Sequence, residues 1–178
     1  ANYGARRDAG MASLATSLVE QTGVERALLW AHAGHVSKEL DAGQDGMGTV
    51  LASNAAIRYY AVGFYLYEGS ARAWDAAGKI GVIPNAIPAA SEYMVEAAFM
   101  AASGHPETAW VPLAGLPDVL QQWIKIPRFV RELGSAYTGV DKLLVLRRVR
   151  VAFDSVVIVR RGHDSSPTPT GIRKASNE

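Results

Sequence analysis

The order of apolar and polar residues predicts an α/β fold, with a mainly parallel sheet flanked by helices. Residues 8–23 carry apolar side chains at the spacing of an amphipathic helix. Residues 26–31 form a nearly continuous apolar run, which is typical of a strand covered on both faces. Residues 58–67 are dense in Tyr, Val and Phe, which favour strands. With a short helix expected between the two strands, this order of elements indicates a mainly parallel sheet.

The other elements follow from local signals. The first helix has a stop signal at Gly23, and residues 32–46, which are rich in Gly, Asp and Lys, predict a long loop or a broken helix. Glycines and prolines interrupt residues 69–87, which predicts a short hairpin or an irregular crossover. Elsewhere we expect helices at residues 47–56, 89–102 and 117–125, and strands at residues 109–113 and 153–160.

The length and composition indicate one folded domain. A chain of 178 residues, 49% of them hydrophobic, is long enough for one core and too short to assume two. Residues 162–178 are rich in Ser, Thr and Pro, and this composition predicts a disordered tail behind a domain at residues 1–161. The chain begins with neither an initiator Met nor a signal-peptide pattern, so we expect a cytoplasmic piece of a longer protein.

Composition also limits the classes of function. The net charge of +1 provides no electrostatic reason to expect nucleic acid or a membrane as partner. The absence of Cys excludes disulfides, Cys-ligated zinc and a thiol nucleophile. No apolar run reaches the roughly 18 residues that span a bilayer. The nucleophile elbow of α/β-hydrolases and the glycine-rich nucleotide-binding motifs are also absent from the sequence.

Two histidines, His32 and His35, directly follow the apolar run and are separated by a loop that contains Gly34. Ligands of α/β proteins collect at the carboxyl ends of strands, and imidazole serves in acid–base catalysis, oxyanion binding and metal ligation. We therefore take His32 and His35 as the candidate site. As a metal site the pair is weak, because its spacing needs a third ligand that no motif supplies.

Arg7 and Asp8 open the first predicted helix, and two interpretations of them stay open. In the simpler one, Asp8 lies at the helix N-terminus, where it complements the dipole or caps the helix. In the functional one, Arg7 holds a carboxylate or an anionic group of a substrate in a bidentate fork.

The spacing of these residues resembles the erythromycin esterase family, which includes succinoglycan-biosynthesis homologues. The matching blocks are Arg7-Asp8-x-x-Met11-Ala12, Trp30-Ala31-His32-x-x-His35-Val36, Met47-Gly48 and Tyr60-x-x-Gly63-Phe64. The first two blocks are fairly specific, and looser matches extend the resemblance over most of residues 6–161.

This resemblance implies a deep cleft in which a histidine activates water to attack an ester, in the best-known members the macrolactone of erythromycin. It implies that His32 and His35 orient water or substrate, or stabilise the oxyanion. It also implies that Arg7, Asp8 and Tyr60 bind substrate or support the site. The expected partner is then a small-molecule ester, with no cofactor.

The chain departs from the family pattern in three ways. Ala33 and Leu14 stand where the family usually has Asn. The Gly-Glu-x-x-His-Gly motif of the family's first half, which carries the proposed general base and a carboxylate, is absent. The chain thus resembles the C-terminal portion of such an enzyme, and a missing N-terminal half is expected to complete the site.

Two alternatives stay open beside this esterase hypothesis. One is a degenerate binding domain that keeps the cleft and lacks the base. The other is a metal-dependent hydrolase that uses His32 and His35 as two of its ligands. The coding sequence upstream distinguishes the esterase from the binding domain, because only the esterase requires a Gly-Glu-x-x-His-Gly motif there.

Overall fold

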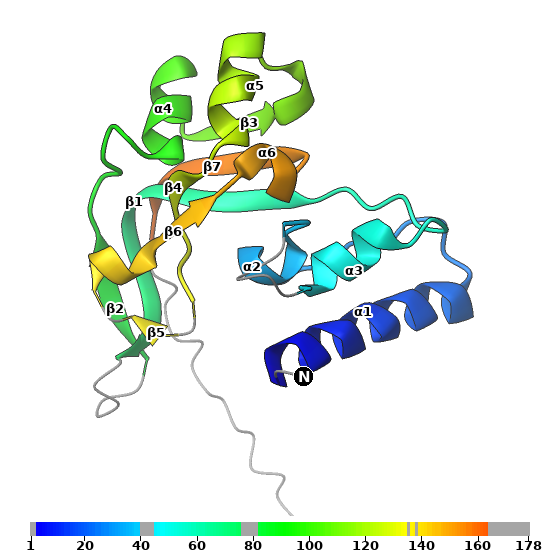
Figure 1. The fold of residues 1–178 in the computed structure, drawn as a ribbon. Helices are drawn as coiled ribbons and strands as arrows, with labels where there is room; N and C mark the ends of the chain where they lie inside the picture. Colours follow the sequence, from blue (N-terminus) through cyan, green and yellow to red (C-terminus); the bar gives the residue numbers. More distant parts are fainter. Residues whose placement is uncertain (1–2, 40–44, 76–81, 135, 138, 164–178) are drawn as a thin grey trace, which may run out of the picture.

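The computed structural model describes residues 3–39, 45–75, 82–134, 136–137 and 139–163 (Figure 1). Helix α1 (Tyr3–Thr22) is followed by a segment without regular secondary structure, the short helix α2 (Ala33–Val36) and helix α3 (Met47–Ser53). The remaining elements are β1 (Val62–Asp75), β2 (Val82–Ile87), α4 (Val95–Ala102), β3 (Thr108–Pro112), η1 (Leu113–Gly115), α5 (Asp118–Lys125), β4 (Arg128–Arg131), β5 (Ala136–Tyr137), η2 (Val140–Leu143), β6 (Leu144–Arg147), α6 (Val149–Ala152) and β7 (Ser155–Gly162).

The main sheet has the strand order β2-β1-β7-β3, and the short β5 also pairs with β1. The central strands β1 and β7 are parallel, with Phe64 opposite Val157, whereas β2 and β3 run antiparallel to their neighbours. The predicted α/β class with helices flanking the sheet is confirmed. The strand directions are mixed rather than mainly parallel, because β1 and β2 form a hairpin, and a short connection can join only antiparallel strands.

The core lies where helix α4 packs on strands β1 and β7. Side chains of Phe153, Val156 and Ile158 are fully buried, and Val95 and Met100 of α4 cover them. Figure 1 shows a second part of the molecule beside this sheet, in which α2 and α3 lie between α1 and the start of β1. We call the part that contains the main sheet and helix α4 the sheet body, and the part that contains α1, α2 and α3 the N-terminal part. One end of β1 lies next to the three helices of the N-terminal part.

Helix α1 buries a different face from the one that its apolar pattern predicts. The predicted apolar stripe includes Leu14 and Leu18, yet these side chains are 61% and 51% exposed. The buried residues of the helix are Asp8, Ala12 and Ala15. Small alanine side chains allow the helix to approach α3 closely, and the larger apolar residues face away from the described part of the chain.

The strand predicted at residues 26–31 is not formed, and this prediction is wrong for the described chain. The segment has no regular secondary structure and belongs to no sheet, and Leu28 and Trp30 are 88% and 77% exposed. The prediction assumed that an apolar run is covered on both faces. The described chain supplies no strand that pairs with the segment, so Leu28 and Trp30 remain largely in solvent although Trp30 contacts Phe64 of β1.

Most other elements agree with the sequence predictions within a few residues. Residues 47–56, 109–113, 117–125 and 153–160 correspond to α3, β3, α5 and β7. In the predicted hairpin region, residues 69–74 of β1 pair with residues 82–87 of β2 in antiparallel fashion, and residues 76–81 lie outside the described residues. Strand β1 begins four residues later than predicted, and α4 begins six residues later, at Val95. Residues 164–178 of the predicted tail lie outside the described residues, while Gly162 still belongs to β7. Helices of the described chain lack the combination of length and apolar character that a bilayer span requires.

Candidate active site

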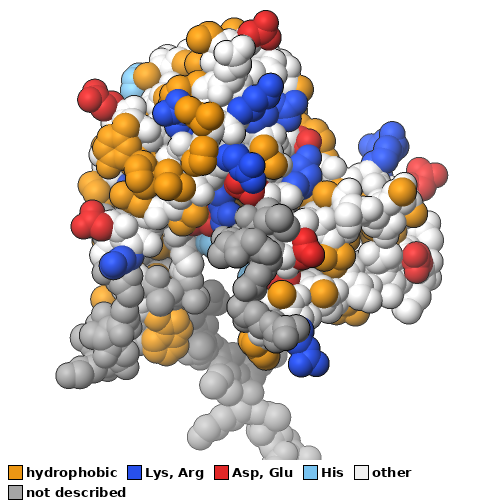
Figure 2. Space-filling model, in the orientation of Figure 1, with side chains coloured by type: hydrophobic (Ala, Val, Ile, Leu, Met, Phe, Trp, Pro, Cys, Tyr) orange, Lys and Arg blue, Asp and Glu red, His pale blue; other side chains and the backbone are white. Residues whose placement is uncertain are grey.

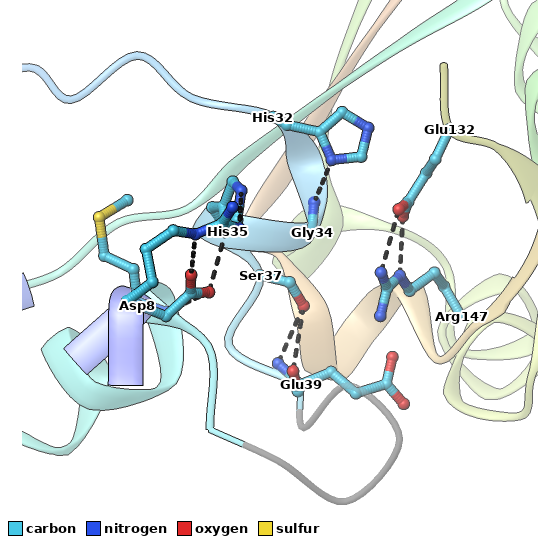
Figure 3. Close-up of polar contacts among 10 residues, drawn as sticks. Asp8, His32, Gly34, His35, Ser37, Glu39, Glu132 and Arg147 are labelled. Atoms are coloured by element: carbon cyan, nitrogen blue, oxygen red, sulfur yellow. Dashed lines mark hydrogen bonds and ion pairs between the residues drawn. The ribbon is translucent and has the colours of Figure 1, made fainter. Parts of the chain in front are cut away.

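Asp8 and His35 form a hydrogen-bonded pair between α1 and α2 (Figure 3). The His35 Nδ1 atom lies 2.9 Å from Asp8 Oδ2, and the same carboxylate oxygen accepts the backbone N–H of Met47 at 3.3 Å. The Asp8 side chain is 10% exposed and that of His35 is 28% exposed. A nearly buried carboxylate thus holds the imidazole in one orientation.

Arg7 completes the arrangement and identifies the tautomer of His35. Its Nη2 atom lies 3.1 Å from His35 Nε2, and its Nε lies 3.5 Å from Asp8 Oδ1. A guanidinium can only donate hydrogen bonds, so Nε2 of a neutral His35 must be the acceptor. The proton of that imidazole is then on Nδ1 and is donated to Asp8, which leaves the basic lone pair on Nε2.

His32 is held in the opposite tautomer. It precedes α2, and its Nδ1 atom accepts the backbone N–H of Gly34 at 3.2 Å. With Nδ1 as acceptor, the proton of a neutral His32 is on Nε2. The two imidazole centroids are 6.4 Å apart and nearly perpendicular. One short turn therefore carries a histidine whose Nε2 is basic and a second whose Nε2–H is a donor.

Close packing of α3 against the end of α2 fixes this turn. A Cβ atom on Gly48 would lie 2.5 Å from the carbonyl oxygen of Ser37 and would also overlap that of Val36, so only glycine permits the contact. Tyr59 adds a hydrogen bond, because its hydroxyl donates to the Val36 carbonyl at 2.7 Å. Burial, reinforced by the Asp154 carboxylate, raises the pKa of Tyr59 to about 12, which keeps this donor protonated.

A buried ion pair lies against the other side of the turn (Figure 3). Arg147 binds both carboxylate oxygens of Glu132, at 2.7 and 3.0 Å, and the two side chains are 4% and 5% exposed. A Cβ atom on Gly34 would lie 3.7 Å from Arg147 Nη2 and 3.8 Å from Glu132 Oε2. Glu132, Arg147 and Tyr59 were not predicted, because no local motif links residues so far along the chain from the histidines.

The structure brings together four of the five predicted site residues, namely His32, His35, Arg7 and Asp8. The fifth, Tyr60, is 57% exposed and makes no recorded polar contact with them within the described chain. The capping interpretation of Asp8 is wrong, because α1 begins at Tyr3 and Asp8 lies in its interior. Within the described ranges, no group of three His, Cys, Asp or Glu side chains is arranged to hold a metal ion.

The family model described as erythromycin esterase matches residues 1–162. A protein from Bacillus cereus is similar in structure, with 18% identity, a TM-score of 0.75, and coverage of 90% of this chain and 39% of that one. A succinoglycan biosynthesis protein has 18% identity and a TM-score of 0.71 over 88% of this chain and 38% of its own.

A mutant of the erythromycin esterase EreC in its open conformation has 19% identity and a TM-score of 0.62, over 89% of this chain and 38% of its own. No curated protein sequence matches. At these identities, the likeness to the solved structures shows the fold alone. The chain spans less than two fifths of the length of each of these three solved structures.

Proposed function

The chain belongs to the erythromycin esterase family, and from that premise we propose that it carries the histidine half of an active site that hydrolyses an ester or macrolactone. The observation that carries the proposal is the pair of opposite tautomers on one turn. His35 presents a basic Nε2 backed by the Asp8 carboxylate, and His32 presents an Nε2–H donor. Ester hydrolysis needs an acceptor that positions the attacking water and a donor that stabilises the oxyanion.

The chemistry assigns a distinct task to each side chain. Water bound at His35 Nε2 attacks the ester carbonyl carbon, and the oxygen that becomes negative accepts a hydrogen bond from His32 Nε2–H. The general base expected in the N-terminal half takes a proton from this water, and the alkoxide accepts that proton as the carbon–oxygen bond of the ester breaks. Arg7 now occupies His35 Nε2, so bound substrate would draw the half-exposed guanidinium to its own carbonyl or carboxylate oxygen.

The second part of the proposal is that an N-terminal half completes the site. The substrate class is a small-molecule ester, and a macrolide is the candidate that the family resemblance suggests. The polypeptide that contains residues 1–178 and the coding region upstream should hydrolyse such esters. Residues 1–178 alone should not exceed the background rate, because they lack the family's Gly-Glu-x-x-His-Gly motif.

The test is hydrolysis of erythromycin and of a simple lactone by the longer polypeptide, followed by mass spectrometry of the products. Asp8→Asn and His35→Asn should each lower kcat by about 10²–10⁴-fold, as expected for loss of positioned acid–base groups. Tyr60→Phe is the matched control, because this exposed hydroxyl makes no recorded contact with the site within the described chain. If residues 1–178 alone hydrolyse the ester and a chelator abolishes that activity, the proposal is wrong and the chain is a metal-dependent hydrolase. Ligand binding without turnover would favour a degenerate binding domain.

A further inference from the structure

The end of strand β6 lies against the histidine turn, residues 32–35, and against the chain that follows it. Arg147 is the last residue of β6, and a Cβ atom on Gly34 would lie 3.7 Å from its Nη2 atom. The next residue, Arg148, binds Glu39 through its backbone N–H, at 3.0 Å from Oε2, and through its Nε, at 2.6 Å from Oε1. Figure 2 shows positive and negative side chains close together where the sheet body meets the N-terminal part. Two consecutive arginines therefore connect the sheet body to the segment that carries the candidate site.

The two arginines differ in burial. The side chains of Arg147 and its bidentate partner Glu132 are 4% and 5% exposed, whereas that of Arg148 is 48% exposed. The loss of hydration offsets most of the attraction within a buried ion pair, and apolar residues of similar volume are often at least as stabilising. Stability therefore does not account for the buried pair at this place. A planar guanidinium held by two hydrogen bonds does provide a support of fixed position and orientation.

Gly34 is the residue through which this support acts on His32. Its backbone N–H donates to His32 Nδ1 at 3.2 Å, which is long for a hydrogen bond of this kind, so a small displacement of Gly34 breaks it. His35 has its own partners, Asp8 and Arg7, which belong to α1. A displacement of Gly34 therefore releases the ring of His32 and leaves the hydrogen bonds of His35 in place.

We propose that Arg147, held by Glu132, is a positioning residue for His32, and this inference rests on the proposed function. The guanidinium supports Gly34, and the Gly34 N–H keeps Nδ1 of His32 as an acceptor. The proton of the neutral ring then stays on Nε2, where it is donated to the oxyanion of the ester. The opposite tautomer would present a bare Nε2 to that oxyanion. The buried pair thus acts on the reaction through the tautomer of His32, without contact with the substrate.

Nuclear magnetic resonance of residues 1–178 with 15N-labelled histidine provides the first test. The double variant Glu132→Leu/Arg147→Met replaces the pair without leaving a lone buried charge, and its melting temperature should stay within about 5 °C of the wild-type value. At pH 8, above the ordinary imidazole pKa of about 6.5, its His32 Nδ1 signal should shift toward that of a protonated nitrogen. The ring signals of His35 should not shift.

Arg148→Met is the matched control for this measurement. It removes a half-exposed side chain and retains the backbone N–H that Arg148 donates to Glu39. The ring signals of both histidines should therefore stay at their wild-type positions.

The second test is ester hydrolysis by the longer polypeptide that includes the upstream coding region. The double variant should lower kcat by about 10²-fold, as expected for a displaced catalytic group, with little change in KM. Arg147→Lys keeps the charge and loses the bidentate geometry, so it should also lower kcat and shift the His32 signals. Arg148→Met should retain the wild-type kcat.

Unchanged His32 signals in the folded double variant overturn the inference, and so does an unchanged kcat beside altered signals. Equal shifts for His32 and His35 also overturn it, because the whole turn has then loosened. If the double variant does not fold, the His32 signals of Arg147→Lys decide in the same way. The proposed function can fail separately. If the longer wild-type polypeptide hydrolyses no ester, the esterase is contradicted, and the His32 signals still decide whether the pair fixes the tautomer.

Discussion

The sheet body and the N-terminal helices are stabilised in different ways. In the body, Val156 and Ile158 of β7 are completely buried, at 0% exposure, and both neighbouring strands pair with them. In the N-terminal part, Leu28 and Trp30 before the histidines are exposed, although Val36 after them is buried, and the polar contact between Asp8 and His35 joins α1 to α2. One hydrophobic core therefore extends through both parts, and the N-terminal part differs in that large apolar side chains beside its candidate site stay exposed.

The largest expected effect is the difference in the free energy of unfolding between substituting a buried apolar residue and substituting an exposed one. Phe153→Ala removes a fully buried ring that packs against Tyr65 and against Gly63. It should lower the free energy of unfolding by about 3–5 kcal/mol. Leu28→Ala should change it by less than about 0.5 kcal/mol in residues 1–178, because the side chain already lies in solvent. Urea denaturation followed by circular dichroism measures both, and similar losses would contradict the distinction.

The next effect concerns a carboxyl group inside the body. Burial raises the pKa of Glu96 to about 7, although hydrogen bonds from the backbone, including Arg131 N–H, oppose the shift. Because the folded-state pKa exceeds the unfolded value of 4.5, the stabilisation is complete below pH 4.5 and is lost as pH rises through 7. The loss is on the order of 3 kcal/mol by pH 8.

Glu96→Gln should flatten this pH dependence. Its amide oxygen can still accept the Arg131 N–H, and it has no proton to lose. The measurement is the free energy of unfolding at pH 5 and pH 8 for both proteins. Glu107→Gln is the control, because Glu107 has a 74% exposed side chain and should retain the original pH profile. An unchanged difference between the two pH values in Glu96→Gln would show that other groups cause the dependence.

A smaller loss of stability is expected when the contact between α2 and α3 in the N-terminal part is disturbed. Gly48→Ala places a Cβ atom against the carbonyl groups of Val36 and Ser37, so α2 and α3 must separate. The expected loss is about 1–3 kcal/mol, with displacement of His35 visible in its NMR imidazole signals. Gly10→Ala in α1 meets no atom within 4 Å and should stabilise the helix by about 0.5–1 kcal/mol. Unchanged His35 signals in Gly48→Ala would show that the turn does not depend on this packing.

The sequence predicted the elements of the sheet body well. It did not predict the solvent exposure of the apolar segment in the N-terminal part. Strand β3 and helix α5 lie where local patterns expected them, because each is bounded by residues that disfavour its continuation. For the segment at residues 26–31, the same reasoning failed. An apolar run indicates a tendency toward burial, and burial also requires a second surface, which the described chain does not supply.

By itself, the sequence determined the class of fold, the family and the four polar residues of the candidate site. These depend on residue types at short spacing, which local patterns preserve. Only the tertiary structure decided the mixed directions of the strands, the exposed face of α1 and the tautomers of the two histidines. The tautomer of His35 depends on Asp8 and Arg7, which precede it by 27 and 28 residues. Such a hydrogen bond exists only once helices α1 and α2 have packed together, so no local pattern could specify it.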